Sequence, residues 1–557
     1  MGRNLGRFAV VSALSLALAA PIADAQKSGG ILIMSHFDSP ASMSMHEEAT
    51  GAVNRPMMGV FNNLIMYRQD VAQNTMASIV PELATGWSWN EDGTELTLPL
   101  RRGVNWHDGK PFTARDVKCT WDLLTGRSAE RLRVNPRKSW YSNLEEVTAN
   151  GDYEVTFRLK RPQPSFLALL ASGWSPVYPC HVLPRDMRAH PIGTGPFKFV
   201  EFRPNERIRV ARNPEYWKPG RPYLDGIEWP IVSSLSTRIL GFVAGSFDQV
   251  FGVTIPLVQD LKSQAPQAVC DVFPANLPRT LLVNRTMPPF DSPELRRAMA
   301  LSVDRQAFID IITLGQGDVG GAMQPPPEGI WGMPPEMLRT LPGYDPDVAK
   351  NRGQAQEFMK KLGYGPDNRL AIRVSARNIA PTRDPAVLLI GQLKEIYIDG
   401  ELEMVDTTNW FPKVLRKDFT VGMVVSENGL DDPDQNFYEN YACGAARNYG
   451  GYCNYEVDAL IDRQSMETDP EKRRRLVWEI ERKLVEDDVR PVLFHPRAAV
   501  CNQPWGEGND PDGQRHLQWL SLRGRLAGQV NGRQSARFRG RRDPARNPRR
   551  HTGIGTS

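Results

Sequence analysis

The sequence lacks the patterns on which most catalytic and metal-binding sites depend. It has no HExxH motif, no His pair at i, i+4 spacing, no paired CxxC motifs, and no GxSxG or phosphate-binding loop. Beyond the N-terminus, no apolar run is long enough to span a bilayer. We therefore expect a protein that is not an enzyme, holds no metal or cofactor, and has no transmembrane helix in its body.

A basic surplus is also missing from most of the chain. The formal net charge is +4, but the segment from Asn502 onward holds 11 Arg against only four Asp or Glu. The preceding body is therefore slightly acidic, and we expect no nucleic-acid partner for it. A nucleic-acid or anionic-membrane arm made by the Arg-rich tail is the rival interpretation of that segment.

The N-terminus has the pattern of a secretory signal peptide. Arg3 and Arg7 precede an apolar run at residues 8–21, and Ala23 and Ala25 are the small residues before a cleavage site. We expect residues 1–25 to be removed near Ala25 and the mature protein to be periplasmic. A retained membrane anchor is the alternative, but it needs about 20 apolar residues, and this run is shorter.

Six cysteines would remain after export, and an even number in an oxidising compartment permits disulfides. Cys443 and Cys453 have the most plausible spacing, because they would close a short loop rich in Gly and Asn. The sequence leaves the other pairings open.

Short strands alternate with helices of different lengths, without internal repeats, which indicates an α/β protein. In the first half we expect a strand at residues 154–159, a hairpin made by residues 197–200 and 208–210, and a helix capped by Thr113.

Later segments are richer in helix. We expect one helix from Ser292 through Arg305, another over residues 385–396, and a long amphipathic helix capped by Asp469. A short strand over residues 491–494 follows it.

Five motifs in series resemble those of the dipeptide, oligopeptide and nickel family of ABC solute-binding proteins. Any one motif is moderately specific, whereas the ordered series is much more so, and the resemblance covers roughly residues 28–502. The motifs are VPELATGW (80–87) with EDGT (91–94), LRRGVNWHDGKPFTARDV (100–117), GTGPF (193–197), RNPEYW (212–217), and PF (289–290) with LRRAMALSVDR (295–305).

The resemblance implies a bilobal, periplasmic-binding-protein-like fold of type II, with an extra subdomain inserted in lobe I. Ligand binding would close the lobes, and the closed form would dock on a permease. The expected division is signal peptide 1–25, lobe I 26–66, inserted subdomain 67–191, lobe I again 192–287, lobe II 288–489, return to lobe I 490–505, and tail 506–557.

The same resemblance points to an acidic segment as the ligand site. In peptide-binding relatives, an acidic residue just before an Asp-Pro sequence pairs with the ligand's α-ammonium group. Here Asp432 begins the matching Asp-Pro-Asp element, but Gly429 stands near the place of the upstream Asp, between Glu427 and Asp431. We expect Glu427, Asp431 and Asp432 to bind the ligand; a solvent-facing acidic loop is the alternative.

Aromatic side chains would supply apolar walls for a ligand. Trp331, Trp410 and Tyr438 are the candidates in lobe II, with Phe37 and Asn63 facing them from lobe I. Some relatives carry nickel chelates or haem, so His36 or His495 could serve such a solute. We nevertheless expect no metal site, since a lone His is more often a packed residue.

The expected function is capture of peptides or peptide-like solutes, by a monomer, for delivery to an ABC permease and its ATPase subunits. A receptor of the same fold for an opine, an oligosaccharide, glutathione or a metal chelate is the first alternative. A signalling or chaperone protein that presents a ligand to a membrane sensor is the second, and a hydrolase the most remote.

The C-terminal segment departs from the family. After Trp505 the family expects a hydrophobic closing strand, whereas this chain continues into an Arg-, Gly- and Pro-rich tail. With suitable codons, a one-base shift restores a family-like ending, so we interpret residues 506–557 as a frameshift product and expect them to be disordered.

Overall fold

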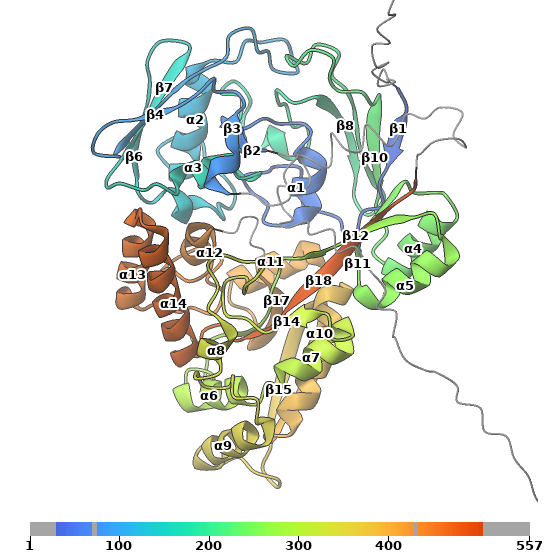
Figure 1. The fold of residues 1–557 in the computed structure, drawn as a ribbon, viewed down its shortest axis with the longest axis vertical. Helices are drawn as coiled ribbons and strands as arrows, with labels where there is room; N and C mark the ends of the chain where they lie inside the picture. Colours follow the sequence, from blue (N-terminus) through green and yellow to red (C-terminus); the bar gives the residue numbers. More distant parts are fainter. Residues whose placement is uncertain (1–28, 69–74, 427–431, 505–557) are drawn as a thin grey trace, which may run out of the picture.

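The chain folds into two halves, each with its own hydrophobic core. The computed structural model describes residues 29–68, 75–426 and 432–504. We call residues 29–275 and 497–504 the first half, and residues 279–494 the second half. Figure 1 shows the first half above, coloured mainly blue to green, and the second half below, mainly yellow to red. The predictions for the signal peptide, the tail, Glu427 and Asp431 fall outside the described residues.

One four-stranded sheet of the first half contains the predicted hairpin. Its order is β1 (Ile31–Ile33), β10 (Gly226–Pro230), β9 (Arg207–Arg212) and β8 (Phe197–Arg203). β1 pairs with β10 in parallel, and the other pairs are antiparallel. Asn205 makes the turn between β8 and β9 with φ 60°, a left-handed conformation that Asn tolerates well.

A second sheet of the first half packs against helices α2 and α3. The elements are β4 (Ser88–Trp89), β5 (Glu95–Pro99), β7 (Glu154–Leu159), β6 (Leu144–Ala149), α2 (Ala114–Thr125), α3 (Phe166–Ala171), and the 3-10 turns η2 (Lys138–Tyr141) and η3 (Asp186–Arg188). Thr113 begins α2 through a capping box with Asp116, and Gly126 ends it with φ 81°.

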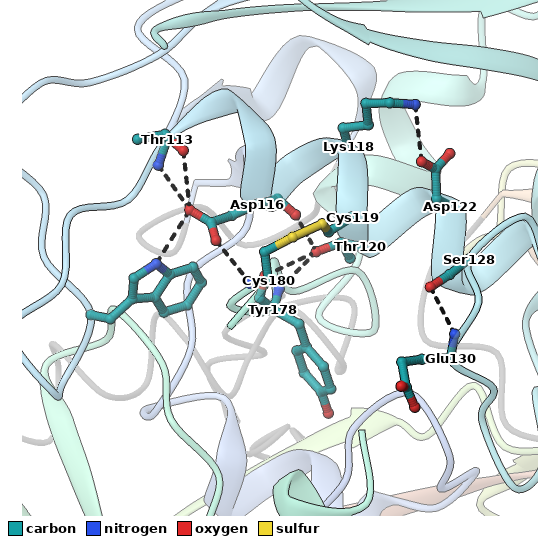
Figure 2. Close-up of a disulfide and its surroundings, with 11 residues drawn as sticks. Thr113, Asp116, Lys118, Cys119, Thr120, Asp122, Ser128, Glu130, Tyr178 and Cys180 are labelled. Atoms are coloured by element: carbon teal, nitrogen blue, oxygen red, sulfur yellow. Dashed lines mark hydrogen bonds and ion pairs between the residues drawn. A yellow bond between two sulfur atoms is a disulfide. The ribbon is translucent and has the colours of Figure 1, made fainter. Parts of the chain in front are cut away.

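A disulfide and several hydrogen bonds tie α2 to the segment that follows α3 (Figure 2). Cys119 pairs with Cys180, and the amide of Cys180 donates to an Asp116 carboxylate oxygen over 2.8 Å. Thr120 and Tyr178 exchange two further bonds of 2.9 and 3.2 Å. The segment is therefore held by both covalent and polar links.

The described part of the first half contains eight further elements. They are α1 (Gly51–Met57), β2 (Ile65–Tyr67), η1 (Met76–Ser78), β3 (Ile79–Pro81), α4 (Leu235–Val243), β11 (Gln249–Val253), α5 (Ile255–Gln264) and β12 (Val269–Pro274). A separate small core forms between α4, α5, β11 and the end of the last strand, where Cys501 pairs with Cys270.

The last strand, β18 (Val492–Asn502), belongs to both halves. Its first residues pair with β13 (Arg279–Val283) in the second half, and residues 497–502 pair with β12 in the first half. The nearby segment 275–279 connects the halves beside it, and the amide of Ala275 donates to the carbonyl of Pro496. In Figure 1, β18 runs obliquely from the lower half into the upper one.

The sheet of the second half continues in the order β18-β13-β17-β15-β16 and is flanked by helices. Its other elements are α6 (Pro293–Leu301), α7 (Arg305–Thr313), β14 (Gly317–Asp318), α8 (Pro335–Leu338), α9 (Val348–Lys361), β15 (Leu370–Arg377), α10 (Ala380–Lys394), β16 (Ile398–Val405), α11 (Thr407–Leu415), β17 (Val421–Val425), α12 (Pro433–Asn440), α13 (Tyr455–Met466) and α14 (Pro470–Glu486).

Three predicted boundaries in the second half are wrong. The helix expected to run through Arg305 stops at Leu301, because the Asp304 side chain accepts from the Ala307 amide and starts a new helix. Helix α10 begins at Ala380, so Pro385 lies inside it. The final strand extends beyond residue 494 because its far end pairs with the first half.

The structure also joins Cys443 to Cys453, in the loop between α12 and α13. Within the described part of the chain, no helix combines the length and the apolar character that crossing a membrane would require.

Candidate ligand-binding cavity

A cavity of about 510 Å³ lies between the two halves. Phe37, the start of α1 and Arg238 of α4 line it from the first half. Trp410 and Phe411 of α11 line it from the second half. The two connecting segments contribute Leu277 and Pro496 among others. Because both halves and their connections form its walls, relative movement of the halves would change its size.

Another hollow, of about 770 Å³, is larger but lies on the second half alone. Arg285, Asp291 and Tyr452 line it, and it is broadly open to solvent. It cannot be closed by movement of the two halves, so the smaller cavity between them is the better candidate for ligand capture.

The charge of the cavity wall is strongly one-sided. Asp384 is the acidic residue among the described lining residues, and it pairs with Arg383 at 2.8 Å. Six arginines line the cavity: Arg55, Arg238, Arg279, Arg377, Arg447 and Arg497.

Four of these arginines have partners within the protein. Arg377 pairs with Asp38 across the two halves, and its guanidinium also reaches Thr407 at 3.1 Å. Arg447 pairs with Glu439 at 2.7 Å, and Arg497 with Glu328 at 2.6 Å and Asp318 at 3.2 Å. The guanidinium of Arg55 lies 3.0 Å from the ring centroid of Phe251, among other interactions. The charges of these side chains are therefore balanced or shared.

Arg238 and Arg279 differ from the other four. They are 5% and 9% exposed, and neither has an acidic partner within ion-pair distance in the described ranges. One amino group of Arg238 donates to the carbonyl of Phe251 over 2.7 Å, and Arg279 donates to the carbonyl of Leu277. The Nε atoms of both have no hydrogen-bond acceptor there. Burial lowers the pKa of each guanidinium to about 10, so both stay charged at neutral pH.

Two residues predicted from the sequence, Phe37 and Trp410, line this cavity. Trp410 is fully buried and packs with Leu282 and Val424. Its indole N–H has no acceptor among the residues that the structure describes. Trp410 can therefore offer an apolar face and a hydrogen-bond donor from the same side chain.

Asp432 lies elsewhere, and the structure gives it a different partner from the expected ligand amine. Its carboxylate accepts two hydrogen bonds of 3.0 Å from the buried guanidinium of Arg473 and also caps α12 at the amide of Asp434. Trp331 packs over the same guanidinium, 4.6 Å from its ring centroid. Asp432 and Trp331 therefore build the core of the second half and do not line the cavity.

Tyr438 and Asn63 also lie outside the cavity lining. Tyr438 donates to Asp462 over 2.7 Å and accepts from Arg161 of the first half over 2.8 Å. Asn63 donates to the carbonyl of Leu170 over 3.3 Å and borders a separate small pocket in the first half. Tyr438 therefore links the two halves, and Asn63 is tied to the C-terminal end of α3.

Helix α12 makes most of its polar contacts with the first half through Asp434 and Glu439. The Asp434 carboxylate accepts from Gln163 over 2.8 Å and from Ser165, both in the first half. Glu439 accepts from the Trp140 indole over 3.2 Å. The Asp-Pro-Asp element therefore holds the two halves together rather than facing the cavity.

The two histidines considered for binding a nickel chelate or haem, His36 and His495, have hydrogen-bond partners within the protein. His36 bonds the carbonyl of Ala52 and His495 that of Gly321, each at 2.9 Å. Burial, reinforced by nearby arginines, lowers the pKa of His36 to about 3 and that of His495 to about 4. Across the described residues, no group of three His, Cys, Asp or Glu side chains could hold a metal ion.

Arg238 and Arg279 line the cavity but were not among the residues predicted from the sequence. A weak signal was available, because each lies in an apolar stretch, LSTRILGFV and RTLLV respectively. An arginine on the buried face of such an element needs an acceptor, and the sequence does not show whether the protein supplies one.

A cavity whose walls come from two halves with separate hydrophobic cores is typical of proteins that enclose a ligand. The chain belongs to the bacterial extracellular solute-binding proteins, family 5, whose middle-region model matches residues 78–448. This family is non-enzymatic, in agreement with the absence of catalytic motifs. The family resemblance inferred from the five motifs is therefore confirmed.

One curated protein and two solved structures illustrate the similarity. The chain is 27% identical over 455 residues to di/tripeptide-binding protein 2 of Pseudomonas aeruginosa, covering 75% of this chain and 82% of the relative. The structure of DppA from Helicobacter pylori with the peptide STSA is similar, with a TM-score of 0.76, 21% identity, and coverage of 88% and 97%. AgaA from A. tumefaciens R10 with agropinic acid has a TM-score of 0.74, 21% identity, and coverage of 91% and 99%. These two structures confirm the expected α/β fold of periplasmic binding proteins.

Proposed function

We propose that this protein captures a small peptide or peptide-like solute in the cavity between its halves and delivers it to an ABC importer. The observation that carries the proposal is a cavity of about 510 Å³ whose walls come from both halves and both connections. A solute that touches both halves favours the closed state by the contacts it makes only there. The closed protein would then be the form that a permease recognises.

Two kinds of observation support a peptide as the ligand: the names of similar proteins and the residues that line the cavity. One relative is named for di- and tripeptides, and a structural neighbour holds a tetrapeptide. The aromatic residues Phe37, Phe251, Trp410 and Phe411 give the cavity apolar walls suited to side chains. Export through an N-terminal signal peptide and a monomeric state belong to the same proposal.

A non-peptide acid, such as an opine, is the second candidate. It is favoured by the surplus of arginine over acid in the cavity wall, which offers no free carboxylate for an ammonium group among the described residues. AgaA, of similar fold, holds agropinic acid.

The test is a stability screen of the purified full chain and of the chain without residues 1–25, against di- to pentapeptides, opines, sugars and metal chelates. A solute at 100 times its dissociation constant should raise the free energy of unfolding by about 2.7 kcal/mol. Val425→Trp, which would place a bulky ring in the cavity wall and obstruct the solute, should reduce the increase. Val387→Trp is the matched control, since Val387 is 56% exposed on α10 and lies outside the cavity wall. The absence of stabilisation by every class would contradict the proposal.

A further inference from the structure

We infer that the cavity selects acidic solutes, whose carboxylate or phosphate oxygens pair with Arg238 from the first half and Arg279 from the second half. This inference rests on the proposed function and specifies the chemistry of its ligand. Four arginines of the cavity wall have partners within the protein, whereas Arg238 and Arg279 have no acidic partner in the described ranges.

The burial of these two side chains requires an explanation. A guanidinium removed from water without an anionic partner is unfavourable, and proteins normally pair such groups. Each of these is at least nine-tenths buried, and each still has an N–H without an acceptor in the described part of the molecule. An oxyanion in the cavity would supply the acceptor and the charge together, in the paired geometry that guanidinium groups favour.

The position of the two arginines links acid recognition to closure. Arg238 lies on α4, and Arg279 begins β13 at the end of the connecting segment. The hydrogen bond from each guanidinium to a backbone carbonyl, of Phe251 or of Leu277, holds it in place before a solute arrives. A solute with an acidic group for each would contact both halves, and these contacts would favour the closed form.

The other residues of the cavity wall indicate what the uncharged part of the solute is like. Phe251, Phe273, Phe411 and Phe494 surround the cavity with aromatic surface, and the Trp410 N–H adds a further donor that lacks an acceptor in the described chain. The combination fits a compact molecule with an apolar or aromatic body and two oxyanion groups.

The experiment uses two matched series of probes and isothermal titration calorimetry. One is N-acetyl-Phe-Glu, N-acetyl-Phe-Gln and N-acetyl-Phe-Gln amide, with two, one and no carboxylates; the other is phenylsuccinate, its monoamide and its diamide. In at least one series the dianion should bind most tightly, and each charge removed should weaken binding on the order of 10-fold or more. N-acetyl-Phe-phosphoserine distinguishes a phosphate preference from a carboxylate preference.

Arg238→Met and Arg279→Met should each weaken binding of the dianion on the order of 10- to 100-fold while leaving the neutral probe unchanged. Arg475→Met, on the exposed face of α14, is the control for loss of one positive charge. Circular dichroism would verify that the variants fold.

Equal binding of charged and neutral probes, or unchanged dianion affinity in both variants, would overturn the inference. So would binding of other solutes from the wider screen without any binding of acids. If no solute of any class binds, it is the proposed function that fails.

Discussion

The contact around α12 and the cavity, both of which lie between the halves, differ in how completely their buried charged groups are paired. Around α12, the carboxylates of Asp432, Asp434 and Glu439 all have protein donors, and several of these come from the opposite half. In the cavity, Arg238 and Arg279 have no acid in the described structure to balance them. A complete set of partners is what a structural contact needs, whereas an incomplete set leaves room for a ligand to complete it.

The largest expected effect is on the α12 side of this comparison. Arg473→Met would leave the buried carboxylates of Asp432 and Asp434 without their cation. Removing one member of a buried ionic network costs about 3–5 kcal/mol, so urea denaturation should show a loss of stability of that order. Arg475→Met, an exposed change on the same helix, should stay within about 0.5 kcal/mol of the unmodified protein. Similar losses of stability in both variants would show that the buried ion pairs of Arg473 contribute no more to stability than an exposed arginine does.

The next effect concerns protonation beside the cavity. The pKa of His36 is lowered to about 3 by burial and then by Arg55, and Arg238 adds a smaller effect. In the unfolded chain His36 would titrate near 6.5, so unfolding takes up a proton below that pH. The stability it contributes is present above pH 6.5 and lost as the pH falls towards 3.

His36→Gln should therefore reduce the slope of stability against pH by up to about 1.4 kcal/mol per unit between pH 6 and 4. Denaturation at a series of pH values measures this slope. Burial raises the pKa of Glu481 to about 7, so its contribution to stability decreases as the pH rises, opposite to that of His36. Because Glu481 is present in both proteins, the difference between their slopes reports His36 alone. An unchanged slope would mean that His36 is charged in the folded protein.

The smallest effect is expected in the cavity itself. Arg279→Met should leave the ligand-free protein within about 1 kcal/mol of its original stability, because the lost bond to Leu277 is offset by removal of a buried charge. The measurement is the same urea denaturation used for Arg473→Met, so the two buried arginines can be compared directly. A loss of stability as large as that of Arg473→Met would mean that Arg279 stabilises the fold. The cavity and the contact around α12 would then not differ in the role of their buried charges.

Local features were predictable from the sequence because their causes are local. The cap at Thr113, the cap at Asp469 and the β8–β9 hairpin depend on residues a few positions apart. The ordered motifs likewise carried the family and its fold. The end of β18 was predicted wrongly because a distant contact decides it, since this strand pairs with strands more than 200 residues earlier. The break between α6 and α7 has a local cause, the cap at Asp304, and the helical pattern on both sides concealed it.

The cavity could be predicted only in part. Phe37 and Trp410, chosen as aromatic residues near the expected cleft, line the cavity, and their contact with a ligand stays a prediction. Asp432 was misplaced because its partner, Arg473, lies 41 residues away and is identified only in three dimensions. Arg238 and Arg279 were not predicted, because the sequence does not show which buried arginines have no acidic neighbour among the described residues.

The shared strand β18 and the adjoining segment 275–279 connect the halves, and both also form part of the cavity floor. Any pivoting of one half against the other must bend the backbone at this floor, near Leu277 and Pro496. A bound molecule would therefore rest directly on the joint that it closes. Under the proposed function, the size of the bound molecule at that point would set the final angle between the halves. The protein would then present a differently shaped surface to its permease with each size of solute.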